Sequence, residues 1–246
     1  EFKVNTKLVN TVGFRRYKKN GKGYFFSPEL IEWLGPMREG DEKDEPYIDY
    51  AASIQALLEK CALHLIDFYL GDIIRETGKV AYAGGVALNV KLNQRIIAMP
   101  GVKELFVQPA SSDAGTAIGA ASYASQLAGV PVEKMEHVYL GPSYTTQQCV
   151  DACERYTQPV SWQYLNDVCA DTAKILADGN PVAWFQGRME FGPRALGNRS
   201  ILGSPNHSGV ADRINAQIKY RERWRPFCPS MLDKVAPEIL QTEHPS

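Results

Sequence analysis

The chain has 246 residues, of which 44% are hydrophobic and 22% are charged, a composition that suits one large or two modest globular domains. The formal net charge of -1 gives no electrostatic reason to expect nucleic acid or a membrane as a partner, and no apolar run is long enough to span a bilayer. The five cysteines are odd in number and irregularly spaced, which argues against a disulfide framework and favours free thiols in a reducing cytoplasm.

The first half of the chain is predicted to combine a hairpin, a long helix and two strand–turn–helix units. The expected elements are a hairpin over 13–26, a helix from Ile48 to near Gly78, a strand over Val80–Ala83, a helix over Val86–Ala98, a strand over Glu104–Gln108 and a helix from Gly115 to Gln126. Strands that alternate with helices predict an α/β fold, in which ligand groups lie at the carboxyl ends of the strands.

A second unit is expected after Gly129-Val130-Pro131, where glycine and proline mark a boundary. Its expected elements are a helix over Thr145–Tyr156, a strand over Val160–Tyr164, a helix over Asn166–Ala177 that Asn166 or Asp167 caps and Gly179 closes, a strand over Val182–Phe185, a helix over Asp212–Lys219 and an extended segment over Tyr220–Phe227. The strand at Val182–Phe185 leads directly into an arginine-rich run.

Two turns of the first half carry candidate ligand groups. Gly84-Gly85 joins a strand to a helix, and Asn89 follows close behind; free N–H groups at a helix start favour an anion such as a phosphate. A Gly-Gly turn is also common for steric reasons alone. Asp113 at the next such turn is either a helix N-cap or a hard oxygen ligand for a metal. Because both turns follow consecutive strands, a nucleotide-phosphate site is the favoured interpretation.

Two basic segments of the second half are candidate anion sites. The run from Gly187 to Ser200 contains Arg188, Arg194 and Arg199 among three glycines, and planar guanidinium groups match phosphate and carboxylate oxygens. A solvated basic loop is the alternative, but apolar residues alternate with the charges. The second segment begins at Lys219 and has a cation at every second position. On an extended strand these cations would all lie on one face: Lys219, Arg221, Arg223 and Arg225.

These segments resemble the O-carbamoyltransferase family, with its NodU-, CmcH- and TobZ-type members. The resemblance rests on GRMEFGPRALGNRSILG from Gly187 to Gly203, and on Lys219-Tyr220-Arg221-Glu222 followed by Arg225-Pro226-Phe227. It also rests on GGVALN from Gly84 and PASSDAGTAIGAA from Pro109, in the family's order, so that it covers the chain from about Tyr82 to Ser230.

The resemblance implies two domains. Residues 1–130 would be the C-terminal half of an actin/Hsp70-like carbamoyltransferase domain, and residues 131–246 an incomplete YrdC-like domain. The YrdC-like domain would make carbamoyl adenylate from carbamoyl phosphate and ATP, with Mg²⁺ accompanying the ATP. The other domain, with bound Fe(II) or another divalent metal, would transfer the carbamoyl group to a hydroxyl of a small molecule such as a sugar, nodulation factor or antibiotic. The family also allows a homodimer.

The resemblance also assigns residues. Asp113 would be a metal ligand, and Gly84, Gly85 and Asn89 would belong to the nucleotide site of the transferase domain. Carbamoyl phosphate and ATP phosphates would be bound by a cationic set, of which the first two are also the expected catalytic residues: Lys219, Arg221, Arg188, Arg194 and Arg199.

Some family features are missing from this sequence. The H-x-x-x-H metal pair is expected before Glu1 and an S-x-N block after Ser246, so we expect a fragment that is inactive alone. Three alternatives remain open: a tRNA threonylcarbamoylation enzyme, a non-catalytic nucleotide- or phosphate-binding module, and a kinase-like ATPase of the actin fold.

Overall fold

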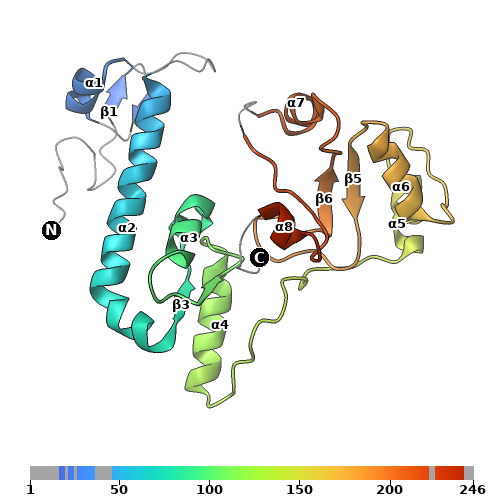
Figure 1. Ribbon diagram of the computed structural model, residues 1–246. Coiled ribbons are helices and arrows are strands. Elements are labelled where there is room, and N and C mark those ends of the chain that lie inside the picture. Colours follow the sequence, from blue (N-terminus) through green and yellow to red (C-terminus); the bar gives the residue numbers. More distant parts are fainter. Residues whose placement is uncertain (1–16, 20–21, 25–26, 37–45, 222–224, 241–246) are drawn as a thin grey trace. The chain divides into compact units, whose positions relative to one another are not determined.

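The computed structural model describes residues 17–19, 22–24, 27–36, 46–221 and 225–240. The chain divides into two compact units, Glu1–Val132 and Glu133–Ser246 (Figure 1). Helices and short strands occur in both units, so the predicted α/β class is confirmed as a mixed α/β chain. The assignment of the units to half of an actin-like domain and to a YrdC-like domain stays a prediction.

The first unit opens with a short hairpin and a short helix. Strand β1 (Tyr17–Lys19) pairs antiparallel with β2 (Lys22–Tyr24), as expected at the centre of the predicted hairpin; residues 13–16, 20–21 and 25–26 lie outside the described part. Helix α1 (Pro28–Leu34) was not predicted. Its start is nevertheless encoded locally, because the Ser27 hydroxyl accepts a hydrogen bond from the backbone N–H of Leu30 at 3.2 Å.

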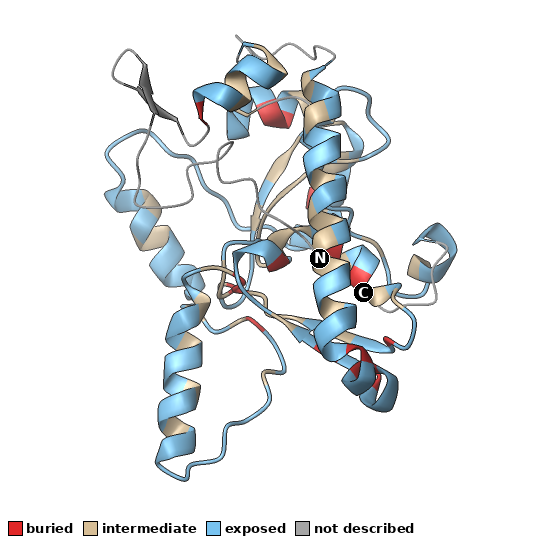
Figure 2. Ribbon diagram, turned by 90° about the vertical axis from the view of Figure 1, so that its left-hand side faces the viewer, coloured by how far each residue is buried: buried red, intermediate tan, exposed pale blue. Residues whose placement is uncertain are grey.

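Helix α2 (Tyr47–Thr77) confirms the long helix and its end. Gly78 has a φ of 71° and donates its backbone N–H to the carbonyl of Ile74 at 2.8 Å. Glycine adopts this left-handed conformation without a steric penalty, which is why it ends helices. Most of the helix surface is exposed in Figure 2, and its buried residues are Gly71 and Ile74.

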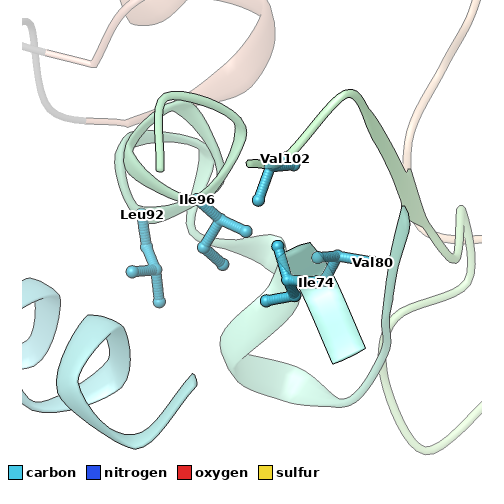
Figure 3. Packing of buried hydrophobic residues seen from close by; sticks show 5 residues of the cluster. All are labelled: Ile74, Val80, Leu92, Ile96 and Val102. Atoms are coloured by element: carbon cyan, nitrogen blue, oxygen red, sulfur yellow. The ribbon is translucent and has the colours of Figure 1, made fainter. Parts of the chain in front are cut away.

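The core of the first unit lies around a parallel pair of strands. Strand β3 (Lys79–Tyr82) pairs with β4 (Glu104–Val107), and α3 (Val90–Ile97) connects them. The buried apolar cluster, shown in Figure 3, consists of Ile74, Val80, Leu92, Ile96 and Val102. Burial of each such side chain stabilises the unit by about 1.5–3 kcal/mol. The cluster therefore fixes α3 against the sheet and sets the starting points of the two loops that follow β3 and β4.

The helix predicted over Val86–Ala98 is divided. A 3₁₀ helix, η1 (Gly85–Leu88), comes first, and α3 begins at Val90. Between them Asn89 has an extended backbone, and its Oδ1 accepts a hydrogen bond from the Leu92 N–H at 3.0 Å. An N-cap residue stands outside the helix that it caps, so the prediction of one continuous helix was wrong in its first turn. Helix α4 (Gly115–Leu127) follows β4 as predicted and contains no buried residue, as Figure 2 shows.

Two capped helices open the second unit. Helix α5 (Thr146–Arg155) begins with a capping box between Thr145 and Gln148, and α6 (Val168–Ala177) begins with Asp167, which accepts a hydrogen bond from the Ala170 N–H at 2.9 Å. Both helices were predicted. The strand expected at Val160–Tyr164 was wrong, because this segment has no strand assignment and pairs with no strand of the described residues.

An antiparallel hairpin is the centre of the second unit. Strand β5 (Val182–Phe185), which was predicted, pairs with β6 (Arg199–Leu202), which was not. The arginine-rich loop over 186–198 joins β5 to β6 at one end of this hairpin. The chain leaves β6 at the other end and enters α7 (Val210–Ile214), as Figure 1 shows.

The segment after α7 differs from its prediction. The helix expected over Asp212–Lys219 continues from α7 as a π-helix, η2 (Asn215–Lys219), and Tyr220 ends it in the left-handed region with a φ of 46°. The extended segment expected over Tyr220–Phe227 was therefore wrong at Tyr220. Residues 222–224 lie outside the described part, and 225–227 are not assigned to a strand. Helix α8 (Ala236–Leu240) follows. None of the helices in the described ranges has the length and hydropathy needed to cross a membrane.

Candidate functional site

The arginine-rich loop between β5 and β6 is held in an irregular conformation by glycines. Gly187, Gly192 and Gly197 have φ values of 56°, 113° and 112°, a region of backbone space that other residues rarely adopt. These glycines bend the backbone at both ends and in the middle of the loop. The turn between Gly192 and Gly197 contains Arg194.

A buried carboxylate organises this turn. The Glu190 side chain is 0% exposed, and its Oε1 accepts hydrogen bonds from the backbone N–H groups of Leu196 at 2.7 Å and Asn198 at 2.8 Å. Its Oε2 lies 3.2 Å from Nε of Arg199. Burial alone would raise the pKa of Glu190, but these backbone hydrogen bonds and the Arg199 charge together hold the pKa below its ordinary value.

Arg199 closes the loop from the start of β6. Besides its ion pair with Glu190, it donates from Nη2 to the carbonyl oxygen of Gly192 at 2.6 Å. The Asn198 amide donates to the carbonyl of Arg188 at 2.6 Å, and the Gln186 N–H donates to the Asn198 carbonyl at 2.9 Å. The two ends of the loop are therefore tied to each other.

The loop is also attached to the segment 138–142. Arg188 donates from Nε to the carbonyl of Gly141 and from Nη2 to that of Leu140, both at 2.9 Å. Backbone hydrogen bonds join Met189 to Gly141 and to Pro142 in the same region. A Cβ at Gly141 would lie 2.8 Å from Cβ of Met189, so the close approach of the two segments requires glycine there.

The three predicted phosphate-binding arginines thus have different environments. Arg188 and Arg199 use two guanidinium nitrogens each on internal acceptors. Arg194 is exposed, and no hydrogen bond or ion pair engages its side chain within the part of the chain that the structure describes. Of the three, Arg194 is the guanidinium that is available to an external anion.

Lys219 and Arg221 lie at the end of the π-helix instead of along a strand. Nε of Arg221 donates to Oδ1 of Asn215 at 2.6 Å, and its guanidinium carbon lies 4.7 Å above the centre of the Phe227 ring. Asn215 is 0% exposed, and its carbonyl accepts the Arg221 backbone N–H at 3.1 Å. Arg221 is therefore held in a fixed orientation, whereas Lys219 is exposed, with no contact to its ammonium group from the described residues.

In the first unit, Gly84 and Gly85 form an open turn and Asn89 is engaged. Gly84 has a φ of 94°, and a Cβ at either glycine would meet nothing within 4 Å. The amide of Asn89 exchanges two hydrogen bonds with Gln55 of α2, at 2.8 and 3.2 Å. A nucleotide that used the Asn89 side chain would have to displace Gln55, so the turn backbone is the more accessible part of this predicted site.

Asp113 lies in a tightly bonded turn, but it is not the N-cap of α4, which is Ala114. Its carbonyl accepts hydrogen bonds from the backbone and hydroxyl of Thr116, at 3.2 and 2.5 Å, and its carboxylate is exposed. Because β3 and β4 are parallel, the Gly84 turn and the loop of Asp113 both begin at the carboxyl ends of the strands, at the same edge of the sheet.

The expected metal does not fit the described residues by themselves. No group of three or more His, Cys, Asp or Glu side chains in the described ranges could hold a metal ion. A divalent transition metal needs several ligands, and Asp113 offers one. The role of Asp113 as a metal ligand stays a prediction, and we derive no chemical step through a metal.

Three residues that hold the predicted site in place were missed from the sequence: Glu190, Asn215 and Gln55. Glu190 was identifiable in principle, because it is the one acid in a run with three arginines. Asn215 and Gln55 carry no comparable signal, because their partners Arg221 and Asn89 are brought to them by a π-helix and by the packing of α2 against α3.

Comparison with known proteins gives matches over most of the chain. The family described as Carbamoyltransferase N-terminus matches residues 2–122, and the one described as Carbamoyltransferase C-terminus matches residues 173–246. Nodulation protein NolNO of Sinorhizobium fredii is 36% identical over 242 residues, which are 95% of this chain and 34% of that protein. Nodulation protein NolO of Bradyrhizobium diazoefficiens is 37% identical over 219 residues, or 87% of this chain and 39% of that protein. Nodulation protein U of Azorhizobium caulinodans is 30% identical over 234 residues, or 94% of this chain and 39% of that protein. The chain therefore spans well under half the length of these relatives.

Proposed function

The chain belongs to the carbamoyltransferase family, and from that premise we propose that it is part of an enzyme that activates carbamoyl phosphate with ATP and transfers the carbamoyl group to a hydroxyl of a small molecule. The observation that supports this proposal best is that the second unit exposes two cations, Arg194 and Lys219, which no other described residue pairs, and also contains the preoriented guanidinium of Arg221.

The charges of the reactants explain why such cations are useful. Carbamoyl phosphate is a compact dianion and ATP carries a triphosphate. Carbamoyl adenylate would form in two displacements. Water first attacks the phosphorus of carbamoyl phosphate, so that its O–P bond breaks and carbamate and inorganic phosphate are released. A carbamate oxygen then attacks the α-phosphorus of ATP, and pyrophosphate leaves with the bonding electron pair. In the transfer step, the acceptor hydroxyl oxygen attacks the carbamoyl carbon, AMP leaves and the hydroxyl proton is released. Each leaving group is an anion, which fixed cations stabilise.

The proposed roles follow from how each cation is held. Arg194 can offer its exposed guanidinium as a planar fork to two phosphate oxygens, and Lys219 can act as a mobile point charge. Nε of Arg221 is occupied by Asn215, and its Nη2 donates to the Pro226 carbonyl at 3.5 Å, so it would present Nη1 to the anion. Because the loop of Arg194 and the helices before Lys219 leave opposite ends of the β5–β6 hairpin, an anion that reaches both would be extended, as ATP beside carbamoyl phosphate would be.

The first unit would supply the transfer step. We propose the backbone of Gly84 and Gly85, with Asn89, as nucleotide contacts, and Asp113 as one ligand of a divalent metal whose other ligands the described residues do not supply. The hydroxylated acceptor would approach at the sheet edge where both loops lie. Mg²⁺ would enter with ATP.

The test measures pyrophosphate release from ATP that depends on carbamoyl phosphate, in the full-length enzyme. We expect Lys219→Ala and Arg221→Ala to abolish release, because each removes a positive charge from the reacting phosphates. Lys174→Ala is the matched control, because Lys174 is an exposed cation of the same unit that pairs with Asp171 at 3.2 Å on α6. Undiminished release in both site variants would refute the assignment, and binding of both ligands without release would favour a non-catalytic binding module.

A further inference from the structure

We propose that Glu190 is a positioning residue for anion binding, which acts by holding the turn that presents Arg194. The inference rests on the proposed function, because it takes the anion of that site to be carbamoyl phosphate. It adds a residue that touches no substrate and that carries the opposite charge to the site around it.

The first argument is the position of the Glu190 carboxylate inside the turn. Its side chain has no exposed surface, and one oxygen accepts the backbone N–H groups of Leu196 and Asn198. These two residues lie two and four positions after Arg194, on the C-terminal side of the turn. A charged acceptor of two N–H groups is stronger than a neutral one, so the carboxylate fixes the path of the backbone from Arg194 to β6.

The second argument is the balance of charge within the loop. The other carboxylate oxygen lies 3.2 Å from Nε of Arg199, and the same arginine donates to the carbonyl of Gly192 before the turn. Glu190 therefore neutralises Arg199 and, through it, ties the residue that begins the turn to the residues that end it. Arg194 lies between these attachments with an exposed side chain.

The third argument is that the backbone of the turn needs such an attachment. Gly192 and Gly197 flank it at φ values of 113° and 112°, and glycine loses more conformational freedom on ordering than any other residue. A turn between two such residues would sample many shapes without a fixed contact inside it. With Glu190 in place, the backbone that carries Arg194 loses its conformational entropy when the chain folds. Less conformational entropy is therefore lost when the anion binds.

The test is a double-mutant cycle, with carbamoyl phosphate and inorganic phosphate titrated into the full-length enzyme by calorimetry. We expect Arg194→Ala and Glu190→Gln each to weaken carbamoyl phosphate binding about tenfold or more. The variant with both substitutions should bind no more weakly than Arg194→Ala alone, because Glu190 acts through Arg194. Lys174→Ala should bind as the unsubstituted chain does.

Separate outcomes identify which proposal fails. If the unsubstituted full-length enzyme binds no carbamoyl phosphate, the proposed function is overturned. If it binds but the two losses multiply, or if Glu190→Gln binds more tightly because Arg199 becomes free, the positioning role alone is overturned. Should Glu190→Gln not fold, amide exchange of the unsubstituted chain remains: slow exchange at Leu196 and Asn198 supports the role, and exchange as fast as in a peptide overturns it.

Discussion

Substitution of alanine for each of the two glycines of helix α4 should change the free energy of unfolding in opposite directions. Alanine normally stabilises a helix relative to glycine by about 0.5–1 kcal/mol. At Gly119 a Cβ would meet nothing within 4 Å, so Gly119→Ala should raise the free energy of unfolding by that amount. At Gly115 a Cβ would overlap the carbonyl oxygen of Ala110. Overpacking of this kind costs about 1–3 kcal/mol, so Gly115→Ala should lower the free energy of unfolding by about 1–2 kcal/mol.

The carbonyl of Ala110 has little freedom to move away. Ala110 is fully buried, and its carbonyl accepts the backbone N–H of Ser112 at 2.7 Å, inside the turn that carries Asp113. Urea unfolding followed by circular dichroism would give both differences on the same chain. Stabilisation by both substitutions would refute the reasoning, because it would mean that Gly115 is not in close contact with the turn. Equal destabilisation by both would point instead to a general intolerance of α4 to alanine.

Two further predictions concern the second unit. Because the pKa of Glu190 is lowered in the folded state, its contribution to stability is present above the ordinary carboxyl pKa of 4.5 and is lost as the pH falls through the folded value. The unfolding free energy of the unsubstituted chain should therefore exceed that of Glu190→Gln at pH 7, and this difference should narrow below pH 4.5 when both are measured in acid. A difference that stays constant with pH would refute the linkage. Asn215→Ala removes the buried acceptor of Arg221 and should cost about 1–3 kcal/mol of stability in urea unfolding while it lowers pyrophosphate release, and unchanged release in a folded variant would show that Asn215 does not orient Arg221.

Elements with strong local patterns were predictable from the sequence. The three- and four-residue spacing of apolar residues from Ile48 predicts α2, and the glycine at 78 predicts its end. Both signals depend only on residues that are close together in the sequence. The division between η1 and α3 was not predicted, because it depends on whether Asn89 lies inside the helix or caps it, and Gln55 of a distant helix helps to hold it there. Val160–Tyr164 has the composition of a strand, but a strand requires a partner that sequence periodicity does not supply.

The candidate site was predictable in its charges but not in its geometry. The clustering of arginines in the run after Gly187 was visible from the sequence, and the family matches bear out the resemblance on which their assignment rested. Which guanidinium is internal and which is exposed depends on contacts with segment 138–142 and with Glu190, which only the folded loop creates. The π-helix that turns Arg221 towards Asn215 was likewise not predictable, because the ten residues of α7 and η2 are too few for their periodicity to distinguish a π-helix from an α-helix.

Identification of the nucleotide product tests the central claim most directly. The full-length enzyme would be incubated with ATP and isotopically labelled carbamoyl phosphate, without an acceptor, and the products would be identified by mass spectrometry. The account predicts labelled carbamoyl adenylate with an equal amount of pyrophosphate, and loss of both in Lys219→Ala. Formation of ADP and phosphate without the adenylate would contradict the account and would indicate a kinase-like ATPase instead.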